Sequence, residues 1–302
     1  MDELDNNKLK AEDDEREVES EENQRGEEIE VNEDRLPSRA MAIHEHIRQE
    51  GEKEMERDAL ALLWSAIAAG LSMGASLLAK GIFHVKLEGI PGGVLLENLG
   101  YTFGFIIVIM ARQQLFTENT DTAVLPVMHN PTLGNVGLLM RLWSVVLAGN
   151  LIGTAVAAWA FNYMPIFDEP TRQAFVSIAE DVMKNSPTEM FANAIISGWL
   201  VATMVWMFPV AGAAKIVVII LMTWLIALAD TTHIVVGSGE ILYLVFNGNL
   251  PWSDFIWPFA LPTLAGNICG GTFIFALLSH AQIRNDMSSK RKAEARAQAA
   301  EK

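Results

Sequence analysis

Long apolar runs without formal charge alternate with shorter polar segments between residues 59 and 283. A helix needs about 20 residues to cross the hydrocarbon core of a bilayer, and the pattern predicts six crossings. Four runs are continuous, namely Ala59–Ala79, Trp143–Phe167, Met190–Ala214 and Phe255–Ile283. Two runs, Asn98–Met128 and Lys215–Leu250, are interrupted by polar residues. The chain is therefore expected to be an all-α integral membrane protein whose second and fifth transmembrane helices are broken, with the transmembrane domain over residues 59–283.

The polar segments between the runs are expected to be loops. Gly81–Glu97 contains three glycines and a proline within five positions, which is typical of a turn. The acidic segment that follows Phe167 and ends at Glu189 is expected to be a second long loop.

The interruption of the fifth run brings ionisable residues into the middle of the membrane. Asp230 and His233 lie with two threonines and two glycines between apolar flanks, neither of which is long enough to cross a bilayer alone. Irregular backbone at this depth persists only where protein or a water-filled cavity satisfies its polar groups. Ionisable groups at such a break mark a transport pathway, because they are costly anywhere else in lipid.

The second run is broken in a related way, at Arg112–Asp121, and the two halves of the chain share a motif. Gly149-Asn150-Leu151-Ile152-Gly153 recurs 117 positions later as Gly266-Asn267-Ile268-Cys269-Gly270. The same offset places Phe116 on His233. Two matches at one offset, with three crossings per half, predict two three-helix repeats of opposite orientation.

Several polar residues are expected to support the two breaks. Asn150 and Asn267 are expected to bond the freed backbone groups, which need partners in lipid. Glu118 and Asp230 are expected to cap the half-helices, with a carboxylate–histidine pair as the alternative. Arg112 is expected to be the counter-ion of Glu118 or Asp121.

Charge is concentrated at the two ends of the chain. Residues 1–34 hold 16 Asp or Glu and four Lys or Arg, so residues 1–35 are expected to be a disordered acidic tail. Residues 36–58 suit an amphipathic helix, and residues 284–302 form a basic tail. Lys and Arg near the crossings favour cytoplasmic termini. Those expected inside are Lys53, Arg57, Arg141, Lys215, Arg284 and Lys290–Lys292, and those expected outside are Lys80, Lys86, Arg172 and Lys184.

An ordered set of motifs resembles the formate/nitrite transporter family. The set consists of Leu115-Phe116-Thr117, Gly149–Gly153, Lys215 followed 18 residues later by His233, and Gly266–Gly271. The resemblance implies an aquaporin-like hourglass of six helices, a homopentamer with one pore per subunit, and passage of small monovalent anions such as formate or nitrite. It also implies a bacterial cytoplasmic (inner) membrane protein.

The resemblance assigns pathway residues by position. It implies that Leu115, Phe116 and Thr117 face His233 at the pore centre, and it places first-half lining positions at Tyr101 and Phe105, which the family spacing selects. The second-half constriction, which is aromatic in the family, falls on Ile226. Further departures are Thr232 before the histidine, Ala202 in the fourth helix and Lys184 two positions out of register.

The sequence thus predicts a channel or proton-coupled transporter for small anions. Thr117 can donate its hydroxyl hydrogen, and His233 can donate or become a counter-charge, so that an anion could cross as the neutral acid. Nucleotide loops, nucleophile sets and metal clusters are missing from the sequence, and we expect no enzyme activity, cofactor, metal or nucleic acid partner. Two rivals remain: a pore for small neutral solutes, and a membrane-anchored interaction protein with a vestigial pore and a recruiting acidic tail.

Overall fold

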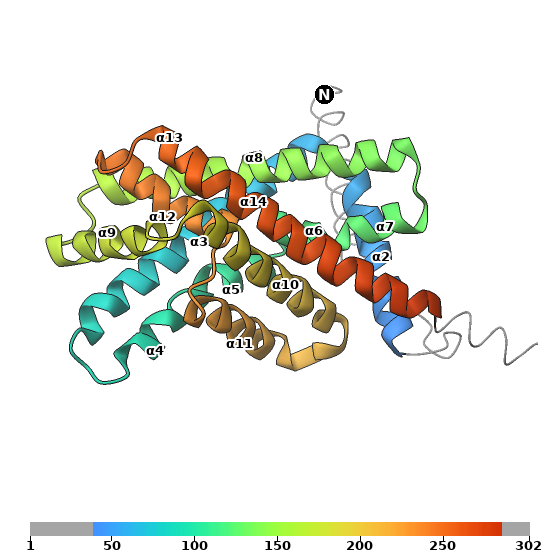
Figure 1. The fold of residues 1–302 in the computed structure, drawn as a ribbon, viewed down its shortest axis with the longest axis horizontal. Helices are drawn as coiled ribbons and strands as arrows, with labels where there is room; N and C mark the ends of the chain where they lie inside the picture. Colours follow the sequence, from blue (N-terminus) through green and yellow to red (C-terminus); the bar gives the residue numbers. More distant parts are fainter. Residues whose placement is uncertain (1–38, 286–302) are drawn as a thin grey trace, which may run out of the picture.

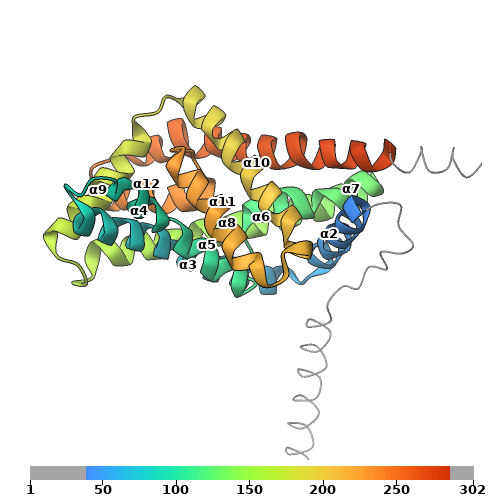
Figure 2. The same ribbon diagram turned by 90° about the horizontal axis from the view of Figure 1, so that it is seen from below.

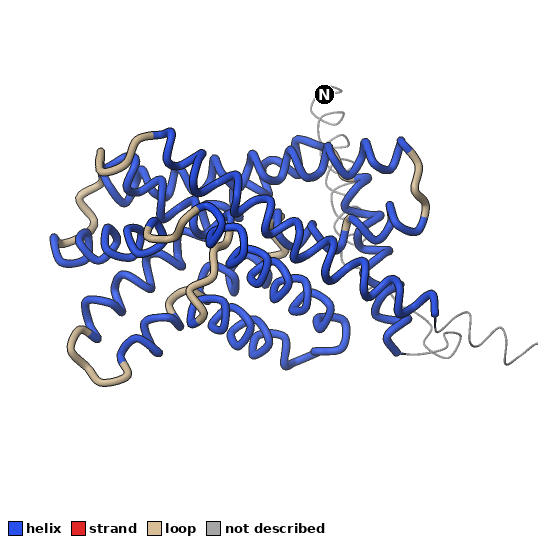
Figure 3. Tube along the Cα trace, in the orientation of Figure 1, coloured by secondary structure: helices blue, strands red, loops and turns tan. Residues whose placement is uncertain are grey.

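The computed structural model describes residues 39–285, and within them all regular structure is helical (Figure 3). The predicted acidic tail, residues 1–35, and nearly all of the predicted basic tail, residues 284–302, lie outside this range. The α-helices are α2 (Arg39–Glu56), α3 (Ala59–Leu87), α4 (Gly93–Leu99), α5 (Thr102–Met110), α6 (Phe116–Thr122), α7 (Val124–His129), α8 (Leu133–Tyr163), α9 (Glu169–Met183), α10 (Pro187–Ala211), α11 (Lys215–Leu228), α12 (Ile234–Asn247), α13 (Trp252–Asp254) and α14 (Leu261–Ile268). The all-helical prediction is confirmed.

Five helical stretches among the described residues are long and apolar enough to cross a membrane. They are Ala59–Leu87, Gly93–Met110, Leu133–Tyr163, Pro187–Leu228 and Trp252–Asn285, and the shorter apolar helix Ile234–Asn247 comes in addition. The fourth stretch contains both α10 and α11, which are joined by a short turn at Gly212. Gly212 has a φ of 47° and a ψ of −126°, a backbone conformation that residues with a side chain rarely adopt. The predicted fourth and fifth crossings therefore follow one another without a long loop.

Different helices lie at the two ends of the long axis of the molecule. Helix α9 lies at one end, and α2 and α7 lie at the other, in both Figure 1 and Figure 2. Helix α8 runs between these ends, with 31 residues or about 46 Å at 1.5 Å per residue. This length exceeds the roughly 30 Å of a bilayer core, so the long axis is the direction in which the helices can cross a membrane.

Two predicted loops are largely helical, so those expectations are wrong. Helix α3 continues to Leu87 and α4 begins at Gly93, which reduces the expected loop to five residues. The acidic segment after Phe167 contains helix α9, whose first turn is capped by Asp168 accepting from the Thr171 N–H. An amphipathic surface helix carries charges on one face, so charge content alone did not distinguish it from a loop.

The predicted sixth crossing is less regular than its sequence suggests. It contains two π-helical segments, η3 (Phe255–Ala260) and η4 (Cys269–Ala276). Trp257 has a non-helical backbone, with φ −139° and ψ 121°. A proline disfavours helical backbone at the residue before it, and Pro258 follows. The expectation of a continuous sixth helix is therefore wrong near its start.

Glycines permit two equivalent close helix contacts. Helix α3 packs along α8, and α10 packs along α14. A Cβ added to Gly153 would lie 2.2 Å from the Ile67 carbonyl oxygen, and one added to Gly270 would lie 2.1 Å from that of Ile195. Only glycine allows backbones to approach this closely, as in other membrane helix pairs. The repeated motif at the 117-residue offset thus makes the same contact in each half.

Large apolar side chains cover much of the outer surface. Examples are Trp64, Val94, Leu133, Val210, Phe273 and Leu278, each more than half exposed. A water-soluble monomer rarely carries so much exposed apolar surface. These side chains suit contact with lipid or with further subunits.

Candidate functional site

Both breaks interrupt the helical backbone in the same way. Arg112 and Asp230 have positive φ angles of 51° and 48°. The N–H of the residue after each one donates to a carbonyl five positions back, that of Val108 (2.9 Å) and that of Ile226 (3.2 Å). This is the geometry with which helices end in a left-handed residue, a position that usually holds glycine. Each first half-helix therefore stops with its last carbonyls satisfied.

A buried asparagine holds the first break. The Phe116 N–H donates to Asn150 Oδ1 over 2.9 Å. Asn150 Nδ2 donates to the carbonyls of Ala66 (2.9 Å) and Gln114 (2.8 Å). One side chain from α8 thus bonds the start of α6, the loop before it and helix α3.

Asn267 makes the corresponding contacts at the second break. Its Oδ1 accepts from the Ile234 N–H at 2.9 Å, and its Nδ2 donates to the carbonyls of Ala194 (2.9 Å) and Thr232 (3.4 Å). Ser197 Oγ, which the sequence did not single out, accepts a further bond from Nδ2 and donates to the Thr232 carbonyl.

These contacts correct the register of the repeat at the breaks. Asn150 and Asn267 are equivalent at an offset of 117. The residues whose N–H groups donate to them, Phe116 and Ile234, are separated by one residue more than this offset. His233 is therefore equivalent to Leu115, and both are the extended residues that precede a half-helix. The predicted pairing of Phe116 with His233 is wrong by one position, because no gap is visible in the sequence between the motifs.

Thr117 and His233 meet between the two half-helices. Thr117 Oγ1 lies 2.8 Å from His233 Nε2, and both residues are almost completely buried. His233 Nδ1 accepts from the Val236 N–H at 3.3 Å, so the ring proton resides on Nε2 and is donated to Thr117. The Thr117 hydroxyl hydrogen then remains available for another acceptor. The contact joins two segments that are 116 residues apart in sequence.

An aromatic row leads away from this contact. The ring centroids of Phe105 and His233 are 5.2 Å apart, and those of Tyr101 and Phe105 are 5.5 Å apart. Leu115 and Ile226 are buried as well. The structure therefore brings Tyr101 and Phe105 to the central histidine from the α5 side.

Phe116 lies elsewhere. Its ring contacts Trp143 of α8 edge to face, at a centroid distance of 5.9 Å. The Trp143 Nε1–H donates to the Asn119 carbonyl at 3.0 Å. Phe116 thus anchors α6 on α8, and only its chain neighbour Thr117 bonds the histidine.

The predicted caps and ion pair are absent. Leu115 and His233 occupy the N-cap positions of α6 and α12. Asp230 instead ends α11 and is exposed, while Glu118 lies within the first turn of α6. Within residues 39–285, Arg112 forms no ion pair with either acidic partner. Arg112 is exposed and has a left-handed backbone, neither of which the sequence indicated.

Helix α2 is connected to the first break by a residue that the sequence analysis missed. Gln114 Nε2 donates to Glu54 at 2.7 Å, and Gln114 Oε1 accepts from Asn119 Nδ2 at 3.0 Å. The position of Gln114 directly before the Leu115-Phe116-Thr117 motif was the available signal.

Helix α2 also carries a buried histidine. His44 Nε2 lies 3.4 Å from His280 Nδ1, and burial lowers the pKa of His44 from 6.5 to about 4.

Two further buried carboxyl groups lie on the half-helices. Asp121 of α6 is fully buried, and neither of its oxygens has a hydrogen-bond partner among the described residues. Glu240 of α12 is 4% exposed and interacts electrostatically with Lys80, whereas Glu118 interacts with Lys215. Glu240 was missed because it lies beyond the polar break, inside an apolar stretch.

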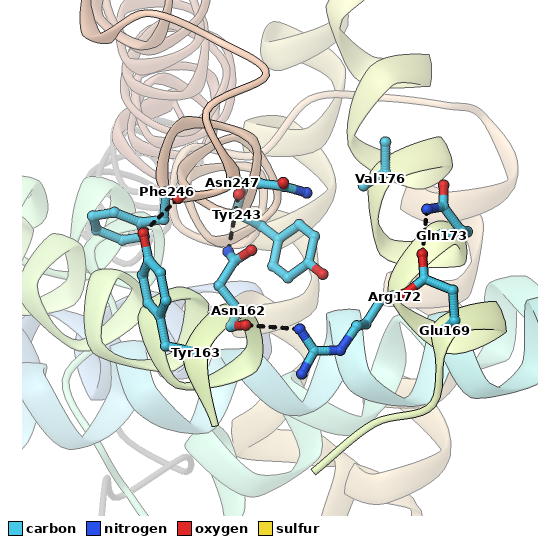
Figure 4. A pocket seen from close by; sticks show the side chains of 9 residues that line it. All are labelled: Asn162, Tyr163, Glu169, Arg172, Gln173, Val176, Tyr243, Phe246 and Asn247. Carbon is cyan, nitrogen blue, oxygen red and sulfur yellow. Dashed lines mark hydrogen bonds between the residues drawn. The ribbon is translucent and has the colours of Figure 1, made fainter. Parts of the chain in front are cut away.

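A pocket of about 360 Å³ lies at the α9 end of the molecule (Figure 4). It is lined by Asn162, Tyr163, Glu169, Arg172, Gln173, Val176, Tyr243, Phe246 and Asn247. Arg172 is held by the carbonyls of Asn162 (2.8 Å), Met164 (3.0 Å) and Phe167 (3.3 Å). The pocket does not include Thr117 or His233, so it is separate from the contact between the half-helices.

Comparison with known proteins identifies the family. Residues 41–281 match the family model described as Formate/nitrite transporter. "Inner membrane protein YfdC" of Escherichia coli (strain K12) is 82% identical over 296 residues, which cover 98% of this chain and 96% of that protein. The "Formate-nitrite transporter" of Plasmodium knowlesi (strain H) is 24% identical over 238 residues, 72% of this chain and 74% of that protein.

Two solved structures share the fold. A chain described as "Pentameric formate channel with formate bound" superposes with a TM-score of 0.63 at 21% identity, covering 75% of this chain and 97% of its own. A chain described as "FNT family ion channel" superposes with a TM-score of 0.68 at 19% identity, covering 78% and 97%. The match over residues 41–281 and the 82% identity to the YfdC relative establish that this chain belongs to the formate/nitrite transporter family, whose members are membrane channels and transporters for small anions rather than enzymes.

Proposed function

We propose that each subunit conducts small monovalent anions of weak acids, such as formate or nitrite, along a pathway that passes Thr117 and His233. The observation that carries this proposal is the 2.8 Å contact between these side chains at the meeting point of two broken membrane helices. Polar groups at such a depth are costly, and they are retained where a solute uses them. The aromatic row of Tyr101 and Phe105 forms one wall of this pathway.

The hydrogen-bond pattern suggests how an anion is accepted. An isolated anion loses its hydration in a dry pathway at a high free-energy cost. Thr117 offers its hydroxyl hydrogen to the solute, while its oxygen accepts from His233 Nε2. The imidazole acts as a neutral donor in this arrangement, because Nδ1 is occupied by the Val236 N–H. Passage of the solute together with a proton then makes flux increase as the pH falls.

The proposed assembly is a homopentamer of six-helix hourglass subunits in the bacterial inner membrane, with both termini cytoplasmic. Support comes from the apolar outer surface, from the equivalent contacts made by the two halves and from the description of one structural neighbour as pentameric. Opposite orientation of the halves follows from three crossings in each, and the distribution of Lys and Arg supports the placement of the termini.

Solute permeation into proteoliposomes tests the function. Vesicles containing the purified protein are mixed with formate, nitrite or glycerol, and their shrinkage and reswelling are followed by light scattering. We expect formate and nitrite to enter well above the rate of protein-free vesicles, faster at pH 5.5 than at pH 7.5, and glycerol to enter no faster than in those vesicles.

Two other results would overturn this proposal. Entry of glycerol without entry of either anion would assign a pore for neutral solutes. A protein that passes none of the three solutes, and whose cellular phenotype disappears when residues 1–34 are deleted, would be an interaction protein with a vestigial pore.

A further inference from the structure

One face of α4 and α5 carries polar groups that lead to the central histidine. Asn98, Tyr101 and Phe105 follow one another at spacings of three and four residues, which places them on one helix face. The Tyr101 N–H donates to the Asn98 carbonyl at 3.2 Å, so the helical backbone continues between them. Phe105 at the end of this row contacts His233.

Helix α12 presents a carboxyl group to the same region. Glu240 follows His233, the N-cap residue of α12, by seven residues and is 4% exposed. Glu240 interacts electrostatically with Tyr101 and with Lys80 of α3. Tyr101 also lies against α3, because its carbonyl accepts from Ser76 Oγ at 2.6 Å. Helix α3 packs against α4, α5 and α12, so these helices meet in one region on the Lys80 side of His233.

Two buried polar atoms in this region lack partners. Asn98 and Tyr101 are 6% and 5% exposed, and neither Asn98 Oδ1 nor Tyr101 Oη has a hydrogen-bond partner among residues 39–285. Native proteins satisfy the great majority of their buried polar atoms, with protein, water or ligand. Two buried unpartnered atoms next to the residues that lead to His233 therefore indicate a binding site for a polar solute.

We propose that Asn98, Tyr101 and Glu240 form a solute subsite in the Lys80-side half of the pathway, selective for the protonated form of a small weak acid over permanent anions. This proposal rests on the pathway proposed above. Asn98 Oδ1 and the Glu240 carboxylate accept hydrogen bonds, and the Tyr101 hydroxyl can accept or donate. An anion without a donor hydrogen meets a like charge at Glu240, which Lys80 offsets only in part. Glu240 is therefore a specificity-determining residue that excludes permanent anions.

Nitrate and formate separate these solute classes, because nitrate is the anion of a strong acid and formate can carry a proton. Glu240→Gln keeps the size of the side chain and removes its charge. We expect the ratio of nitrate to formate flux in proteoliposomes at pH 8 to rise about tenfold, which corresponds to about 1.4 kcal/mol of repulsion removed. Glu88→Gln is the matched control, because it removes a charge from an exposed position at the end of α3, and its ratio should equal that of the wild type.

A second variant addresses the tyrosine without changing charge. Tyr101→Phe removes only the unpartnered hydroxyl, so a merely structural role predicts unchanged flux. We expect formate flux to fall several-fold while nitrate flux stays at the wild-type level. Size-exclusion chromatography shows whether each variant keeps the wild-type assembly.

The outcomes distinguish the subsite from the channel itself. If Glu240→Gln keeps wild-type formate flux and an unchanged ratio of nitrate to formate flux, the subsite is overturned and the channel stays intact. If Glu240→Gln does not assemble, unchanged formate flux in Tyr101→Phe overturns the subsite in the same way. A wild type that passes neither anion, together with a Glu240→Gln variant that gains nitrate flux, would support the subsite and refute anion conduction. If neither the wild type nor Glu240→Gln conducts formate or nitrate, both the proposed channel and the proposed subsite are overturned.

Discussion

Replacement of Asn267 by leucine is expected to destabilise the protein by about 3 kcal/mol, because buried backbone groups would lose their partner. The Ile234 N–H has Asn267 Oδ1 as its acceptor, and leucine offers none. Water cannot substitute at this depth, since Asn267 is completely buried. Unsatisfied backbone groups cost several kcal/mol in hydrocarbon, so the start of α12 should lose its position.

Thermal unfolding in detergent, followed by circular dichroism or by loss of the assembled species on size-exclusion chromatography, measures this effect. Asn249→Leu is the matched control, because Asn249 is exposed in the turn after α12 and makes no side-chain hydrogen bond among the described residues. Asn150→Leu should behave like Asn267→Leu, since the Phe116 N–H loses the same support. Equal midpoints for Asn267→Leu and the control would show that Asn267 does not hold the break.

Replacement of His233 by phenylalanine is expected to reduce formate flux 10- to 100-fold, since a hydrogen bond to a charged group contributes about 1.5–3 kcal/mol. Phenylalanine preserves the ring that packs on Phe105 but removes Nε2, which donates to Thr117. Without this donor the Thr117 hydroxyl group is no longer held in the orientation that points its hydrogen at the solute. The anion therefore loses its hydrogen bond from Thr117. We expect the increase of flux at low pH to remain, because the proton travels with the solute and not on the imidazole.

Variants at Thr117 separate the hydroxyl from the shape of the side chain. Thr117→Val is nearly isosteric and should reduce formate flux to a similar extent, whereas Thr117→Ser keeps the hydroxyl and should retain most of the flux. The double variant with His233→Phe should be no slower than either single one, since both act through one hydrogen bond. Wild-type formate flux in His233→Phe would refute the proposed role of the contact.

Hydropathy alone predicted the helical membrane domain and both breaks, because charge-free runs of about 20 residues have few alternatives to helices in lipid. The repeated glycine–asparagine motif also predicted the equivalent positions of Asn150 and Asn267. Register at the breaks was harder. The repeat offset is one residue longer at the breaks than at the asparagines, so the residue equivalent to His233 is Leu115 and not Phe116. No local sequence pattern indicates this difference.

The roles of individual polar residues followed from the backbone rather than from residue type. Asp230 and Arg112 are a good cap and a good counter-ion by chemistry, yet both are exposed residues that end a half-helix with a left-handed backbone. Gln114 and Ser197 bond the breaks although neither residue type marks a site by itself. Glu240 lies in an apolar stretch, where only its position two turns after His233 could have drawn attention.

Sidedness of cysteine modification tests most directly whether the two half-helices line one pathway that His233 divides. Cys269 is the only cysteine of the chain, so a Cys269→Ser background allows single cysteines at Glu118 and Glu240. A membrane-impermeant thiol reagent should block formate flux at these two positions from opposite sides of the vesicle. It should leave Phe103→Cys, at a position 45% exposed on the outer surface, fully active. Block of both positions from the same side, or of neither, would contradict a pathway between the breaks.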